Sequence, residues 1–360
     1  MLYRYNYIKE HKMVTLNKHF LYFIRKIRNV TPGTPFNRVN YFHHTFLNAN
    51  GRIAPNNRIV PSLETTFQSF FETYRELDVA SKQDFYNLVR FSCNIHTFYE
   101  DASVDVNPLK KDNIRAIIGN DSFENLMNAL WGSLKSNAWE IDAHYKDFFE
   151  DLQSKTCTFC GINQLPNPES YRADYDHIAY KGLYPISTIN LKNIAPSCSE
   201  CNTKFKLQKD IFYEDDNTTR RISNYPYLNF IEVQIDFTGT ILPQTVLGNE
   251  NGTWNLNFVP NNDYTRTWED LYNIKHRYIT EVLQVDFKTW LGHFKKELQQ
   301  YNVIINDHDE IKNYFLKHYE RYNEERLQKR YIVKSSLFKY FNECDNEVFY
   351  NQLISEINQR

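Results

Sequence analysis

Two cysteine pairs constrain what this chain can fold into more than any other feature of its sequence. Each pair has the spacing C-x-x-C, with Cys157 and Cys160 in the first pair and Cys198 and Cys201 in the second. Such a turn presents two thiolates together, and four thiolates complete a tetrahedron around Zn²⁺ at about 2.3 Å per bond. We therefore predict that the two pairs bind one structural zinc ion. An iron–sulfur cluster and redox disulfides are the alternatives.

A closed four-sulfur site has no open coordination position, so any chemistry would have to come from other residues. The remaining cysteines, Cys93 and Cys344, have no close partner in the sequence and are expected to be small buried hydrophobes. No apolar run approaches the roughly 18 residues of a membrane span, and the start of the chain does not have the pattern of a secretory signal. We therefore expect a soluble protein of a reducing, cytoplasmic compartment.

Positive charge is concentrated at the start of the chain. Residues 1–60 carry a net charge of +9 and the remainder −11, although the whole chain has a net charge of only −2. This segment contains one acidic residue, Glu10, and ten basic ones: Arg4, Lys9, Lys12, Lys18, Arg25, Lys26, Arg28, Arg38, Arg52 and Arg58. The asymmetry is typical of an arm that binds a polyanion. A solvated basic face that docks on acidic helices of the same chain explains it equally well.

Hydrophobic residues at three- and four-residue intervals predict helices on both sides of the cysteine region. Before that region, residues 122–134 and 139–152 follow this pattern. A further helix, capped by Ser81, is expected to contain Phe85, Leu88, Val89, Phe91, Ile95 and Phe98. After the cysteine region, helix is expected from Tyr264 onward, with one face formed by Trp268, Leu271, Ile274, Tyr278 and Val282.

The predicted fold class is α+β: a mostly helical chain with a central zinc-bound module and a small β-hairpin region after it. Residues 230–237 and 254–259 supply the hairpin, because they are rich in β-branched and aromatic residues and are separated by turn formers at 248–252. Five consecutive domains are predicted. They are a basic aromatic arm (1–60), a helical domain (61–155), the zinc module (156–210), a β/loop extension (211–262) and a C-terminal helical domain (263–360).

The segment between the cysteine pairs is longer than a zinc ribbon requires. It has 37 residues, whereas a simple ribbon needs roughly 15 to 20. It contains the dipeptide Asp176-His177 and a central Asn193, and Asn202 follows the last cysteine directly. Each of these alone would more often be a surface residue, a turn residue or a helix cap. Their joint occurrence inside a zinc knuckle points to a site.

This constellation resembles the HNH endonucleases, whose ββα-metal module is written D-H … N … C-x-x-C-N-x-K. The matching positions are Asp176-His177, Asn193, Cys198, Cys201, Asn202 and Lys204. The chain looks especially like a bacterial subgroup with a Lys, a Tyr-Pro-x-x-Ser run and a downstream His-Pro-Tyr-Phe-Asp motif. Lys181, Tyr184-Pro185 and Ser187 keep this pattern loosely, Tyr180 replaces a Pro, and residues 225–229 are a loose version of the last motif. The resemblance covers about 50 positions.

The resemblance implies roles that suit the chemistry of phosphodiester hydrolysis. His177 would be the general base, and Asp176 and Asn202 would offer oxygen ligands to Mg²⁺ or Mn²⁺. Asn193 would brace the loop between two strands. Lys181, Lys204 and Lys206 would contact phosphates, and Asp174 would add an outer contact. Adjacent strand residues point to opposite faces, so Asp176 and His177 are expected at a strand end or a bulge.

The expected function is therefore a metal-dependent endonuclease that acts on DNA, with RNA as an open alternative substrate because the module contacts backbone and not bases. A zinc module that binds nucleic acid or protein without catalysis is the alternative from another class. By family analogy, the chain would be the nuclease of a bacterial defence or mobile-element system with an ATPase partner. The sequence contains no Walker-type phosphate loop of its own.

Overall fold

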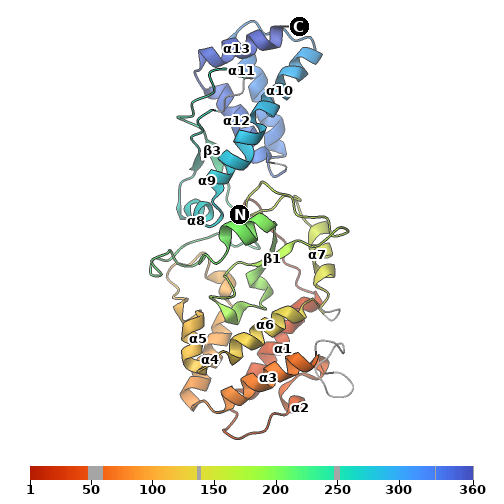
Figure 1. Cartoon of the computed structure of the whole chain (residues 1–360), viewed down its shortest axis with the longest axis vertical. Coiled ribbons are helices and arrows are strands. Elements are labelled where there is room, and N and C mark those ends of the chain that lie inside the picture. The colour runs from red at the N-terminus through yellow and green to blue at the C-terminus, as the bar shows by residue number, and fades with distance from the viewer. Residues whose placement is uncertain (48–59, 136–138, 247–251, 329, 360) are drawn as a thin grey trace. The chain divides into compact units, whose positions relative to one another are not determined.

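The computed structural model describes residues 1–47, 60–135, 139–246, 252–328 and 330–359. The chain is mostly helical α+β, with strands in two small two-stranded antiparallel sheets (Figure 1). Arg52, Arg58 and the turn residues 248–251 lie outside the described part. Among the described helices, none is long and apolar enough to cross a bilayer.

The contacts divide the chain into two compact units, each made of separate stretches of sequence. Unit 1 contains Met1–Arg4, Ser154–Leu165 and Phe230–Arg360, and unit 2 contains Tyr5–Gln153 and Pro166–Asn229. The division into five consecutive domains remains a prediction.

Unit 2 contains the helices that precede the cysteine region. They are α1 (Lys12–Ile27), α2 (Arg38–Tyr41), α3 (Val60–Arg75), α4 (Val79–Ser92), α5 (Lys111–Ile118), α6 (Ser122–Ser133) and α7 (Ile141–Glu150). Helices α3 and α6 pack together, as do α4 and α5 (Figure 1). The helices predicted over 122–134 and 139–152 are therefore present as α6 and α7.

Helix α1 shows that much of the basic N-terminal segment is part of the folded unit. Its apolar face is buried and consists of Met13, Leu16, Phe20, Phe23, Ile24 and Ile27. Lys18, Arg25 and Lys26 are exposed on the same helix. Within the basic segment, Lys12–Ile27 is thus an amphipathic helix with basic residues on its exposed surface.

Helix α4 begins earlier than the sequence pattern suggested. The cap is Asp78 and not Ser81: a carboxylate oxygen of Asp78 accepts a hydrogen bond from the Ser81 backbone N–H at 2.8 Å. The prediction of Ser81 as cap is wrong because Asp is an equally good N-cap and lies one turn ahead. The helix also ends at Ser92, so Ile95 and Phe98 are buried in the turn that follows it.

The second half of unit 2 contains a strand pair followed by a helical turn. Strand β1 (Asp174–His177) pairs antiparallel with β2 (Ile194–Ser197), and the register places His177 opposite Ile194. Two 3₁₀ turns, Pro185–Ser187 and Leu191–Asn193, lie in the connection. A helical segment begins at Ser199, as predicted, and continues as the π-helical turn Cys201–Lys206.

Unit 1 contains the second sheet and the C-terminal helices. Strands β3 (Gln234–Asp236) and β4 (Asn257–Val259) are antiparallel and shorter than predicted. The helical elements are α8 (Asp263–Tyr272), α9 (Ile274–Arg277), a π-helical turn (Tyr278–Leu283), α10 (Gln284–Gln300), α11 (His308–Glu324), α12 (Tyr331–Glu343) and α13 (Glu347–Asn358). The face predicted from Trp268 to Val282 is buried at all five positions.

Candidate functional site

Four cysteines form a cluster that fits a zinc-type metal. The Sγ atoms of Cys157, Cys160, Cys198 and Cys201 all lie within 4.8 Å of one another, and all four residues are buried. Tetrahedral coordination at 2.3 Å would place the sulfurs about 3.8 Å apart, so the cluster has suitable dimensions. No other group of three or more metal-ligating side chains of these types occurs among the described residues.

The first pair lies on a turn that its own backbone closes. The N–H of Gly161 donates to the Cys157 carbonyl at 2.9 Å, and the N–H of Ile162 donates to the Cys160 sulfur at 3.4 Å. Gly161 has a φ of +69°, which a residue with a Cβ rarely adopts. Cys93 and Cys344 lie outside the cluster and are half-buried, not fully buried as expected.

His177 is held in one orientation at the end of strand β1. It is the last residue of the strand. Its Nε2 lies 2.9 Å from the carbonyl oxygen of Thr188. A carbonyl only accepts, so Nε2 carries the proton and Nδ1 keeps its lone pair. No hydrogen bond to Nδ1 is found within the described part of the chain.

The surroundings of His177 keep its ring neutral. The indole of Trp131 packs edge-on against it with ring centroids 4.3 Å apart. Burial lowers the pKa of His177 to about 3, although the bond to Thr188 acts in the opposite direction. The cause is burial, because the residue is only 7% exposed. The neutral form is the one that can accept a proton.

Asp176 is buried with one oxygen bonded and the other free. Its Oδ1 accepts a hydrogen bond from the Lys206 ammonium at 3.0 Å, and its Oδ2 has no hydrogen-bond partner although it is buried. Burial raises the pKa of the Asp176 carboxyl, and the Lys206 ammonium acts in the opposite direction. A buried carboxylate oxygen without a partner is unfavourable unless a cation or a water fills its place. Oδ2 is therefore suited to a hard cation.

Asn193 braces the connection between the strands by hydrogen bonds to backbone. Its Oδ1 accepts from the Ala179 N–H at 2.8 Å and from the Tyr99 hydroxyl at 2.9 Å. Its Nδ2 donates to the Ala179 carbonyl at 2.9 Å. The side chain is fully buried. These contacts hold Ala179, two residues after His177, in the connection between the strands.

The other predicted site residues are less constrained. Asn202 is the second residue of the π-helical turn and is half-buried. Its backbone N–H donates to the Cys198 carbonyl at 3.2 Å. Lys204 is exposed, and the Lys181 ammonium lies 5.9 Å from the centroid of the Trp131 ring. Asp174 is exposed at the far end of β1. Asn202 and the two lysines are thus available to a ligand.

Lys206 is buried, although the resemblance implied a phosphate contact for it. Its side chain has no exposed area, and its ammonium bonds Asp176 and the His177 carbonyl. An ammonium engaged in this way inside the protein serves the carboxylate and not a phosphate in solvent. The exposed Lys204, two residues earlier, points out of the fold instead.

Tyrosine hydroxyls bond backbone carbonyls in strand β2 and in the turn just before it. Tyr225 donates to the Lys192 carbonyl at 2.8 Å, and Tyr227 donates to the Ile194 carbonyl at 2.6 Å. Tyr5 reaches the Pro196 carbonyl at 3.2 Å. Unpaired carbonyls at a buried strand edge need donors, and these hydroxyls supply them. The loose 225–229 motif thus supports the strand pair, a role that no signal in the sequence specified.

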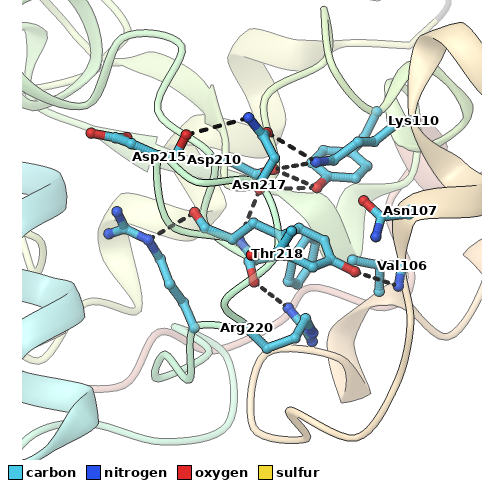
Figure 2. A network of polar contacts seen from close by, with 12 residues as sticks. Val106, Asn107, Lys110, Asp210, Asp215, Asn217, Thr218 and Arg220 are labelled. Carbon is cyan, nitrogen blue, oxygen red and sulfur yellow. Dashed lines mark hydrogen bonds and ion pairs between the residues drawn. The ribbon is translucent and has the colours of Figure 1, made fainter.

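A polar network fastens the loop after the helical turn (Figure 2). The hydroxyl of Tyr184 donates to both carboxylate oxygens of Asp210, at 2.9 and 2.8 Å, and the Lys110 ammonium lies 3.4 Å from the same carboxylate. Nearby, the Arg220 guanidinium donates to the carbonyls of Val104, Phe98, Asp101 and Phe212. The Tyr-Pro motif of the sequence therefore serves to anchor this loop beside the strand pair.

Comparisons with family models, with curated proteins and with solved structures found no match to this chain.

Proposed function

We propose that this chain is a metal-dependent endonuclease of the HNH type that hydrolyses phosphodiester bonds of nucleic acid, with DNA as the preferred substrate. The observation that carries the proposal is the contact between His177 Nε2 and the Thr188 carbonyl. It leaves Nδ1 as the basic nitrogen of a neutral imidazole. This is the state that a general base needs before it accepts a proton from water.

In the proposed reaction, Nδ1 of His177 takes a proton from water while the water oxygen forms a bond to phosphorus. The bond between phosphorus and the leaving sugar oxygen breaks, and that oxygen takes a proton from solvent. Bound Mg²⁺ or Mn²⁺ would neutralise charge on the phosphoryl and leaving oxygens. Asp176, through Oδ2, and Asn202, through its amide oxygen, would hold this ion. The four cysteines would hold the structural zinc.

The exposed Lys204, Lys18, Arg25 and Lys26 and the half-buried Lys181 would contact the nucleic-acid backbone. Lys204 and Lys181 lie near the candidate site in sequence, and Lys18, Arg25 and Lys26 lie on α1 of the same unit. Phosphate contacts of this kind make binding strongly dependent on salt. A cytoplasmic defence or mobile-element system, with control by an ATPase on another chain, is the context that we propose from family analogy.

Cleavage of a supercoiled plasmid with Mg²⁺ or Mn²⁺ tests the proposal. The variant His177→Ala should lose at least about 100-fold in rate, since general acid–base catalysis contributes that much. The matched control is His318→Ala, which removes another buried histidine with a lowered pKa, located in unit 1. Cleavage by His177→Ala at the wild-type rate would rule out the assignment of the base.

A non-catalytic zinc module is the second candidate, and one observation favours it: Asp176 and His177 are 4% and 7% exposed. Residues this buried can serve packing alone. The two functions give different results in the same assay. Retarded migration of DNA or RNA without cleavage, under Mg²⁺ and Mn²⁺, would support the binding module and contradict the nuclease.

A further inference from the structure

Lys206 is a buried lysine whose ammonium faces two adjacent residues of the candidate site. Its side chain has no exposed area, and lysine is almost never fully buried unless it is paired. The residue is the last of the π-helical turn Cys201–Lys206, which also carries Asn202. One short turn therefore supplies both an expected cation ligand and a buried ammonium.

The two hydrogen bonds of this ammonium divide between a side chain and the backbone. Nζ donates to Asp176 Oδ1 at 3.0 Å and to the His177 carbonyl oxygen at 2.7 Å. The first bond fixes the rotation of the Asp176 carboxylate, so that Oδ2 is the oxygen left without a partner. The second bond holds the peptide of the residue that carries the imidazole. A single lysine thus constrains both groups at the end of β1.

We propose that Lys206 is a positioning residue that orients the Asp176 carboxylate to offer one oxygen, Oδ2, to a divalent cation. This inference rests on the proposed function for the identity of the ion. Lys206 would act through Asp176 and would not touch the ion or the nucleic acid. Partners that orient a metal ligand commonly change metal affinity by about 10- to 100-fold when they are removed.

The test measures Mn²⁺ binding without any nucleic acid. Zinc-loaded full-length protein is titrated with Mn²⁺ and the free ion is followed by electron paramagnetic resonance. Wild type should bind Mn²⁺, Asp176→Asn should not, and Lys206→Met should bind it about 10- to 100-fold more weakly. Lys206→Gln should also bind it more weakly, since its shorter amide cannot make both bonds.

The matched control is Lys82→Met. Lys82 is another buried lysine of unit 2, 5% exposed, whose ammonium donates to the Arg75 carbonyl at 2.7 Å. This variant should keep wild-type affinity for Mn²⁺. Zinc content and circular dichroism establish which variants are folded. Wild-type Mn²⁺ affinity in either folded Lys206 variant would overturn the positioning role, and so would a wild type that binds no Mn²⁺.

The failure of this inference can be distinguished from the failure of the proposed function. Cleavage lost in His177→Ala, together with unchanged Mn²⁺ affinity in Lys206→Met, would overturn the role of Lys206 and leave the nuclease. Weakened Mn²⁺ binding in Lys206→Met, together with a wild type that cleaves nothing, would support the role of Lys206 and contradict the nuclease.

Discussion

The strand pair of unit 2 and the C-terminal helices of unit 1 each bury a lysine, and they stabilise it by different means. Lys206 has a carboxylate and a carbonyl as partners. Lys334, 7% exposed, lies among rings: its ammonium is 3.8 Å from the Tyr322 centroid and 5.6 Å from that of Trp290. The Lys334 ammonium makes no hydrogen bond to the described residues. Burial lowers the pKa of this side chain to about 8.

The difference shows what each region is organised to do. Hydrogen bonds are directional, so the partners of Lys206 also fix the orientation of Asp176 and of the peptide of His177. Ring contacts are less directional and tolerate either charge state of the amine. The strand pair therefore holds particular atoms in place, whereas the C-terminal helices bury apolar area. The predictions below test this contrast.

Removal of the metal should have the largest effect, and it should act on the cysteine region. Structural zinc contributes on the order of 10 kcal/mol to small modules that depend on it. Cys198→Ser should therefore lose bound zinc and unfold at a markedly lower temperature. Metal analysis and thermal unfolding measure both quantities. Cys93→Ser, outside the cluster, should retain one zinc per chain, and equal zinc content in the two variants would contradict the site.

In the C-terminal helices, loss of a ring should be the costly change. Phe315 is fully buried and stacks on Phe294 with centroids 4.7 Å apart. Phe315→Ala should lower the free energy of unfolding by about 3–5 kcal/mol, because it leaves a cavity. Urea denaturation measures this. The neighbouring Leu316→Ala, at a position 37% exposed, should change it by less than about 1 kcal/mol.

In the strand pair, loss of a polar side chain should be costly although little apolar area changes. Asn193→Ala would leave the Tyr99 hydroxyl and the Ala179 backbone groups without partners. The expected loss is about 3 kcal/mol, since each unmade buried bond costs roughly 1–3 kcal/mol. Asn87→Ala, at an exposed position of α4, is the control. Equal unfolding midpoints for the two variants would show that the brace is unimportant.

The smallest effect should be the pH dependence that Lys334 contributes. Its folded-state pKa of about 8 lies below the unfolded value of about 10.4, so the unfolded chain binds more protons between these pH values. Its contribution should therefore destabilise the fold below pH 8 and disappear as the pH rises toward 10, a gain on the order of 2 kcal/mol. Urea midpoints of wild type and Lys334→Met, compared from pH 7.5 to 10, measure it. If the urea midpoints of the two proteins changed with pH in the same way, the lowered pKa of Lys334 would be contradicted.

Structural features were predictable from the sequence where they depend on residues close together in the chain. Spacing of three and four residues identified the buried face from Trp268 to Val282, because helical geometry alone places these side chains together. The cap of α4 was missed, since Asp78 and Ser81 are both residue types that cap helices well and the chain begins the helix at the earlier one. The grouping of Met1–Arg4 with residues beyond 230 has no local signal at all.

The sequence by itself determined that two C-x-x-C turns would each present two thiols, because that spacing brings the sulfurs of one turn together whatever surrounds it. It also determined which residues could supply a base and oxygen ligands. Only the tertiary structure decided that Lys206 turns inward to Asp176, that the Thr188 carbonyl selects the tautomer of His177, and that Tyr227 and Tyr5 bond carbonyls of β2. These partners come from distant segments, and a side chain's role depends on which donor or acceptor the fold places within about 3 Å of it.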